Sequence, residues 1–172
     1  MRITIVIMIL FIFVGCQSFN QGMTPGVKVI KSDFDGHTEI IQPPVSAASS
    51  LKESWHTMGF RWTDEAPDTV FLKVGVPGIE NVEGCAFNID GQIIEAKVAS
   101  ATTEYGTISN GKQSYRQFVV PLSVFKKISS AKIVKMKVSS INNYSVSSFG
   151  EERSGAIVNG KIDAFITALG KQ

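Results

Sequence analysis

The chain of 172 residues has few of the residues on which metal sites and nucleophilic catalysis depend. It contains only two cysteines and two histidines, and neither His37 nor His56 has a second ligand at the spacing of a metal site. No Gly-x-Ser-x-Gly turn and no His-Glu-x-x-His pair occurs. The sequence therefore predicts no catalytic residues, no metal and no cofactor. It leaves open a hydrolase whose site is assembled from distant positions.

The chain also lacks an excess of charge of either sign. It carries 17 basic and 15 acidic residues, a formal net charge of +2, whereas nucleic-acid-binding domains are strongly basic. We therefore expect no nucleic-acid partner. Two carboxylate pairs, Asp64-Glu65 and Glu151-Glu152, lie beside turn residues. Catalytic carboxylates need burial to shift their pKa values, so we interpret both pairs as solvated loop charges.

A phosphate-binding loop is suggested by one segment and then excluded by its details. The segment from Gly106 to Lys112 has the spacing of such a loop. The next residue should be Ser or Thr to hold magnesium, and a helix should follow. Gln113 stands there instead, and the run after it resembles a strand. We interpret the segment as a hairpin turn.

The one long apolar run stands at the amino terminus. It covers residues 3–14 after Arg2 and is shorter than the ~20 residues that a membrane-spanning helix needs. Its length fits the ~7–15-residue apolar region of a secretory signal peptide. An ordinary cleavage site has a small residue where this chain has Phe13. We therefore expect a different kind of processing.

The four residues Phe13-Val14-Gly15-Cys16 resemble the lipobox of bacterial lipoproteins, although Leu is usual at the position of Phe13. The resemblance covers only the leader. It implies that residues 1–15 are removed and that Cys16 carries a diacylglycerol, often with a third acyl chain. Two or three chains anchor a protein stably on a membrane.

The same resemblance implies a location in the bacterial cell envelope. Gln17 follows the cysteine where Asp would favour retention on the inner membrane, so the outer membrane is favoured; the side that the domain faces is left open. Residues 16–26 are polar and turn-prone after the cysteine, as expected of a lipidated tether. If Cys16 is acylated, Cys85 has no partner for a disulfide, and its phase with Phe87 and Ile89 predicts a buried, inert thiol.

The rest of the chain, residues 27–172, is predicted to be one domain built mainly from antiparallel strands. Turn dipeptides at Asp35-Gly36, Asp90-Gly91 and Asn110-Gly111 predict three hairpins. Period-two alternation predicts strands with one buried face, eight to ten in all. The runs that alternate contain Met58, Phe60 and Trp62; Val70, Leu72, Val74 and Val76; and Val134, Met136 and Val138.

Two helices complete the predicted α+β class. A short one is expected to be capped by Ser123, with Val124, Phe125 and Ile128 facing inward. The second is an amphipathic C-terminal helix that packs on the sheet, starts near Ser154 or Asn159 and ends before Gly170. Its inward positions are Val158, Ile162, Phe165, Ile166 and Leu169. Residues 43–54 are predicted to be a loop.

Charge distribution suggests a candidate partner face. Residues 105–150 hold seven basic residues and no acidic one, while residues 64–104 are acidic. The candidate basic residues for a ligand or partner are Lys126, Lys127, Lys132, Lys135 and Lys137. Two simpler explanations compete: the two halves neutralise each other, or the lysines block edge-to-edge aggregation. Trp55 is a further candidate, because nothing in the pattern places it in the core.

We therefore expect a non-catalytic envelope lipoprotein with a small β-rich interaction or accessory domain. Its partners would be the membrane, through Cys16, and an envelope protein or an anionic polymer. Two alternatives stay open: a binding module for an anionic or glycan ligand, and a hydrolase with a dispersed site.

Overall fold

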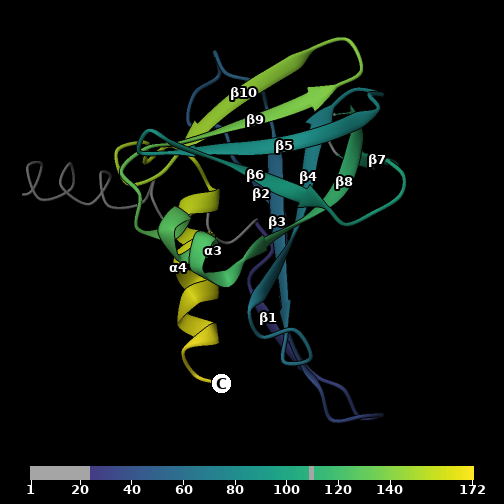
Figure 1. The fold of residues 1–172 in the computed structure, drawn as a ribbon, viewed down its shortest axis with the longest axis vertical. Coiled ribbons are helices and arrows are strands. Elements are labelled where there is room, and N and C mark those ends of the chain that lie inside the picture. Colours follow the sequence, from purple (N-terminus) through teal and green to yellow (C-terminus); the bar gives the residue numbers. More distant parts are fainter. Residues whose placement is uncertain (1–23, 109–110) are drawn as a thin grey trace, which may run out of the picture.

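The computed structural model describes residues 24–108 and 111–172, which contain ten strands and two helices (Figure 1). Every strand pair is antiparallel, and the predicted α+β class is confirmed. The strands are β1 (Lys28–Lys31), β2 (Thr38–Ser46), β3 (Thr57–Thr63), β4 (Thr69–Pro77), β5 (Val82–Ile89), β6 (Gln92–Val98), β7 (Glu104–Ile108), β8 (Gly111–Pro121), β9 (Val134–Ser140) and β10 (Tyr144–Phe149). The helices are α3 (Leu122–Ser129) and α4 (Val158–Leu169).

The strands form one strongly bent sheet in the order β1-β2-β3-β4-β8-β6-β5-β9-β10, with β7 also paired to β8. Strand β8 joins its two halves: one edge pairs with β4 along its length, and the other pairs first with β7 and then with β6. Arg116 of β8 donates to the carbonyls of Val82, Ser100 and Ala101. Figure 1 shows β5, β6, β9 and β10 crossing the ends of the steeper strands β2, β3 and β4.

The concave side of the bent sheet holds the core. The predicted alternation is confirmed, because the apolar positions of β3, β4 and β9 are buried and Lys135 and Lys137 between them are exposed. Helices α3 and α4 cover this side. Phe60 of β3, Phe125 of α3 and Phe165 of α4 meet edge to face, with ring centroids 5.2 to 5.5 Å apart. Such ring pairs add to the energy of apolar burial, and this group links both helices to the sheet.

The hairpins follow the turn dipeptides with one difference in length. Asp90 and Gly91 both have positive φ and form a two-residue turn between β5 and β6, as predicted. The pairing of β7 with β8 confirms the hairpin at Gly111, whereas residues 109–110 lie outside the described residues. Strands β1 and β2 also pair as predicted, but their connection runs from Ser32 to His37 and is longer than two residues.

Two local predictions were wrong. Neither helix has a side-chain cap: Pro121 precedes α3, so Ser123 does not cap it. Helix α4 begins at Val158, beside Asn159 as predicted, and Ile157 precedes it. Residues 43–46 belong to β2 rather than to a loop. The pairing of β2 with β3 shifts between Gln42 and Val45, and this bulge accommodates the two prolines within the strand. Neither helix of residues 24–108 and 111–172 is long and apolar enough to cross a membrane.

Candidate functional site

A large apolar cleft lies where β2 and β4 end and where β3 and β8 begin. Its volume is about 760 Å³, within the ~300–1,000 Å³ typical of ligand sites. Most of its walls are apolar or aromatic, and Trp55 is 45% exposed there. The residues that line this Trp55 cleft are Thr24, Pro44, Val45, Ser46, Trp55, His56, Thr57, Pro77, Lys112, Gln113, Tyr115 and Ile157.

The floor of the Trp55 cleft is a row of residues on neighbouring strands. Thr57 of β3 pairs with Gly75 of β4, and Gly75 pairs with Tyr115 of β8. A Cβ atom at Gly75 would lie 2.7 Å from the Tyr115 ring and closer still to the Thr57 hydroxyl. Glycine at this position therefore lets both side chains lie across β4 and form the floor.

A few polar groups converge on the apolar walls. Lys112 is the only charged residue in the lining, and among the described residues it forms no ion pair. The buried hydroxyls of Thr24 and Thr57 have no hydrogen-bond partner within the described part of the chain. The Tyr115 hydroxyl donates to the Gln113 side chain, and burial raises the pKa of Tyr115. Unpaired buried hydroxyls are costly, but these two oxygens have almost no exposed surface, so a ligand in the cleft does not reach them.

Hydrogen bonds connect the loop that carries Trp55 to β10, the last strand of the sheet. The Glu53 carboxylate accepts hydrogen bonds from the backbone and hydroxyl of Ser148 in β10, and from Ser49. The Ser54 amide donates to the Val146 carbonyl at 3.4 Å. These bonds engage the otherwise free edge of β10. They also hold Trp55 in place without using its own side chain.

His56, the residue after Trp55, is buried and also connects this loop to β10. It is 0% exposed, with Nδ1 3.0 Å from the Ser147 hydroxyl and Nε2 2.7 Å from the Ser145 hydroxyl. Burial lowers the pKa of His56 to about 4. A neutral imidazole beside Ser145, which lines a hollow of about 240 Å³, resembles the start of a nucleophilic pair. Its low pKa makes it a weak base, and a hydroxyl rather than a carboxylate faces Nδ1; we therefore assign the pair a structural role.

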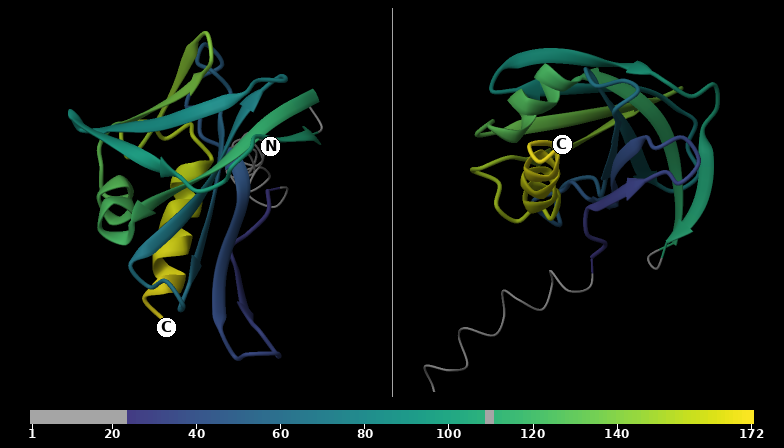
Figure 2. Two further views of the ribbon diagram at one scale, coloured as in Figure 1. Left: turned by 45° about the vertical axis from the view of Figure 1, so that its right-hand side comes forward. Right: turned by 90° about the horizontal axis from the view of Figure 1, so that it is seen from below.

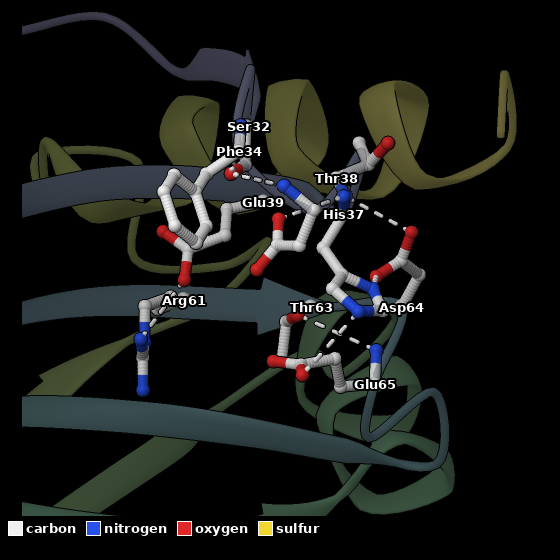
Figure 3. Close-up of polar contacts among 10 residues, drawn as sticks. Ser32, Phe34, His37, Thr38, Glu39, Arg61, Thr63, Asp64 and Glu65 are labelled. Carbon is white, nitrogen blue, oxygen red and sulfur yellow. Dashed lines mark hydrogen bonds and ion pairs between the residues drawn. The ribbon is translucent and has the colours of Figure 1, made fainter.

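A second histidine joins two turns on the surface at the opposite end of β2. His37 Nδ1 lies 2.9 Å from Asp64 Oδ1, and its Nε2 lies 3.5 Å from Glu65 Oε1 (Figure 3). The other Asp64 oxygen accepts from the Thr38 amide at 2.9 Å. The hydrogen bond to Asp64 raises the pKa of His37. The carboxylate pair is exposed, as predicted, but it also binds the β1–β2 loop to the β3–β4 turn.

The candidate lysines do not share one face. Lys126 and Lys127 lie on the outer side of α3, which covers the concave side of the sheet. Lys135 and Lys137 project from the convex side of β9, where Lys137 lies 4.5 Å from the Tyr144 ring centroid. The backbone amide of Lys132 donates a hydrogen bond to the Asp90 carboxylate. Trp55 is separate from all of them and is the candidate that lines a cleft.

Of the two cysteines, only Cys85 lies within the described residues. Cys85 is buried, as predicted, and burial raises the pKa of its thiol far above the usual range. Such a thiol is inert near neutral pH. Cys16 and the rest of the leader lie outside the described residues. Within the described residues, no three metal-ligating side chains gather into a group that could hold an ion.

No protein family model and no curated protein matches this chain.

Proposed function

We propose that this chain is a lipid-anchored protein of the bacterial cell envelope whose domain binds an apolar or aromatic group in the Trp55 cleft. The observation that carries the proposal is the cleft itself, with its half-exposed Trp55 and its Tyr115 floor. Exposed aromatic rings in a concave, mostly apolar site are typical of binding sites. The lipobox-like leader ending at Cys16 supports the anchor and the location.

A glycan ligand is the second candidate, supported by the half-exposed ring of Trp55 in the cleft. A sugar ring can stack on an aromatic side chain while its hydroxyls form hydrogen bonds with the wall. Trp55 provides such a ring, and Lys112 provides an exposed polar side chain in the same lining.

Binding in the cleft can be followed through the protein's own fluorescence. The chain contains two tryptophans, and Trp62 is buried with its indole donating to the Pro67 carbonyl. In a Trp62→Phe chain begun at Thr24, which contains the whole core, Trp55 is the only indole reporter. We expect the neutral dye N-phenyl-1-naphthylamine to quench Trp55 by energy transfer in a saturable manner. A soluble β-1,4-linked N-acetylglucosamine oligomer that displaces the dye would favour the glycan candidate.

Two variants show whether the dye occupies this cleft. In the wild-type background, Trp55→Ala is expected to weaken dye affinity, followed here by the dye's own fluorescence, about tenfold, because a central aromatic contact is removed. Ile93→Ala removes an apolar side chain that is 72% exposed on β6, and it should leave the affinity unchanged. Far-UV circular dichroism confirms that each variant is folded. Absence of saturable quenching, or equal weakening by both variants, would reject the cleft as a binding site.

The anchor is tested separately in cells. Cys16→Ser is expected to abolish incorporation of labelled palmitate and to leave an uncleaved precursor, since the thiol that receives the lipid is gone. The measurement is gel mobility with radiolabel after membrane fractionation. A matched Cys85→Ser chain should be processed normally, because that thiol is buried in the domain. Normal processing of the Cys16→Ser chain would reject the lipoprotein assignment.

A further inference from the structure

The loop between β1 and β2 presents a fully exposed aromatic ring. Phe34 is 101% exposed, and the β1–β2 hairpin, blue to purple, projects from the body (Figure 2). Hydrogen bonds within the loop fix the backbone that carries the ring. The amides of Phe34 and Asp35 donate to the Ser32 hydroxyl at 3.3 and 3.4 Å, and the Gly36 amide donates to the Ser32 carbonyl at 3.0 Å.

The same loop is fixed to the body of the domain. His37 joins it to Asp64 and Glu65 (Figure 3), and its amide donates to Asp35 Oδ1 at 3.2 Å. A loop whose backbone is already fixed loses little freedom when its exposed side chain enters a partner. Phe34 is therefore presented as a preorganised contact residue.

We propose that Phe34 inserts into the Trp55 cleft of a second copy of this chain. This inference rests on the proposed function, and it names the partner of that site. The cleft provides apolar and aromatic walls for the ring. In the proposed contact, Lys112, the only charged residue of the cleft lining, meets a loop in which Asp33 and Asp35 flank Phe34. The apolar ring matches the apolar walls, and the charges of the loop and of the cleft are opposite.

The placement of the two features makes the contact intermolecular. The Phe34 loop precedes Thr38, where β2 begins, and the cleft includes Ser46, where β2 ends. These residues are eight steps apart along the strand, roughly 27 Å at ~3.4 Å per residue. A ring at one end of β2 cannot reach the cleft at the other end of the same strand. Contact between different patches of two copies is head to tail and can extend to further copies.

The contact is small, since one loop enters one cleft. Stable interfaces bury about 1,200–2,000 Å², so weak association is expected between free copies. Anchoring on a common membrane raises the effective concentration of one copy near another. The head-to-tail contact is therefore expected on the membrane, and the test is made there with the full chain.

Photo-crosslinking in cells tests the contact. The benzophenone amino acid p-benzoylphenylalanine is placed at position 34 of the full, tagged chain, and the cells are irradiated. We expect a covalent dimer of the chain, with mass spectrometry mapping the adduct to Trp55, Pro44, Ile157 or another cleft residue. The reciprocal placement at position 157 should give adducts within residues 32–37. The probe at Leu51, which is also exposed, should give no such dimer.

Two further variants establish the chemistry of the contact. Trp55→Ala should lower the dimer yield from position 34 about tenfold. Lys112→Glu should lower it about threefold, as for an exposed ion pair, and adding Asp33→Lys in the same chain should restore it. Asp35 is left unchanged because it holds the loop. No dimer, adducts only to another protein, or adducts on another surface of this chain would overturn the inference. Saturable dye binding in the cleft would in that case leave the proposed function standing.

Discussion

Replacing Phe165 with alanine is expected to lower the free energy of unfolding by about 3–5 kcal/mol, the usual cost of removing a buried phenylalanine ring. The Phe165 ring is fully buried, and its centroid lies 5.2 Å from that of Phe60 and 5.5 Å from that of Phe125. The substitution therefore opens a cavity where α4, α3 and β3 meet. Urea unfolding of the chain begun at Thr24, followed by circular dichroism, measures the change.

The matched control is the same substitution at a ring that touches nothing in the domain. Phe34→Ala removes a fully exposed ring, and substitutions at such positions usually change the unfolding free energy by less than about 0.5 kcal/mol. A clear difference between the two variants separates packing energy from the intrinsic effect of losing a phenylalanine. If Phe165→Ala cost no more than Phe34→Ala, the packing of α4 against the sheet would be wrong.

The parts of the fold that were predictable are those specified by local pattern. Val134, Met136 and Val138 alternate with lysines, and this period of two places them in the core whatever strand lies beside β9. The turn at Asp90-Gly91 was equally predictable, because both positions need positive φ. The inward face of α4 follows in the same way from helical spacing.

The features that were missed depend on packing or on long-range contacts. Pro43 and Pro44 suggest a loop, but a bulge over Gly59 keeps them in β2. The side-chain partner of Asn159 also depends on context, because Asn159 binds the backbone of Gly150 at the start of α4. Local propensity cannot anticipate such partners.

The candidate site was predictable only in part. Trp55 could be singled out because no strand or helix pattern claims it. The remaining walls of the cleft come from five separate segments, which only the sheet order brings together. The contact of His56 with Ser145 joins residues 89 positions apart, and no spacing in the sequence signals it. The candidate lysines are adjacent in sequence but divided by the sheet in space.

Acid is expected to destabilise the domain through His56. Burial lowers the pKa of His56 from 6.5 to about 4. Between these values the unfolded chain binds a proton at His56 that the folded chain does not. The contribution of His56 to stability is therefore fully present above pH 6.5 and is lost as the pH falls toward 4. The pKa difference corresponds to about 3 kcal/mol. Burial raises the pKa of Glu53, but hydrogen bonds from Ser148 and Ser49 outweigh it and lower the pKa, so further stability is lost below about pH 4.5.

The measurement is urea unfolding at pH 7 and at pH 4.5, with wild-type and His56→Gln chains begun at Thr24. Glutamine keeps polar atoms near Ser145 and Ser147 but does not titrate, so the variant is expected to lose most of the difference between the two pH values. His37→Gln is the control: His37 is exposed and its pKa is raised, so its contribution has the opposite sign and is lost as the pH rises. An NMR titration of wild-type His56 gives its pKa directly. A value near 6.5 would contradict the buried, neutral imidazole that fastens the Trp55 loop to β10.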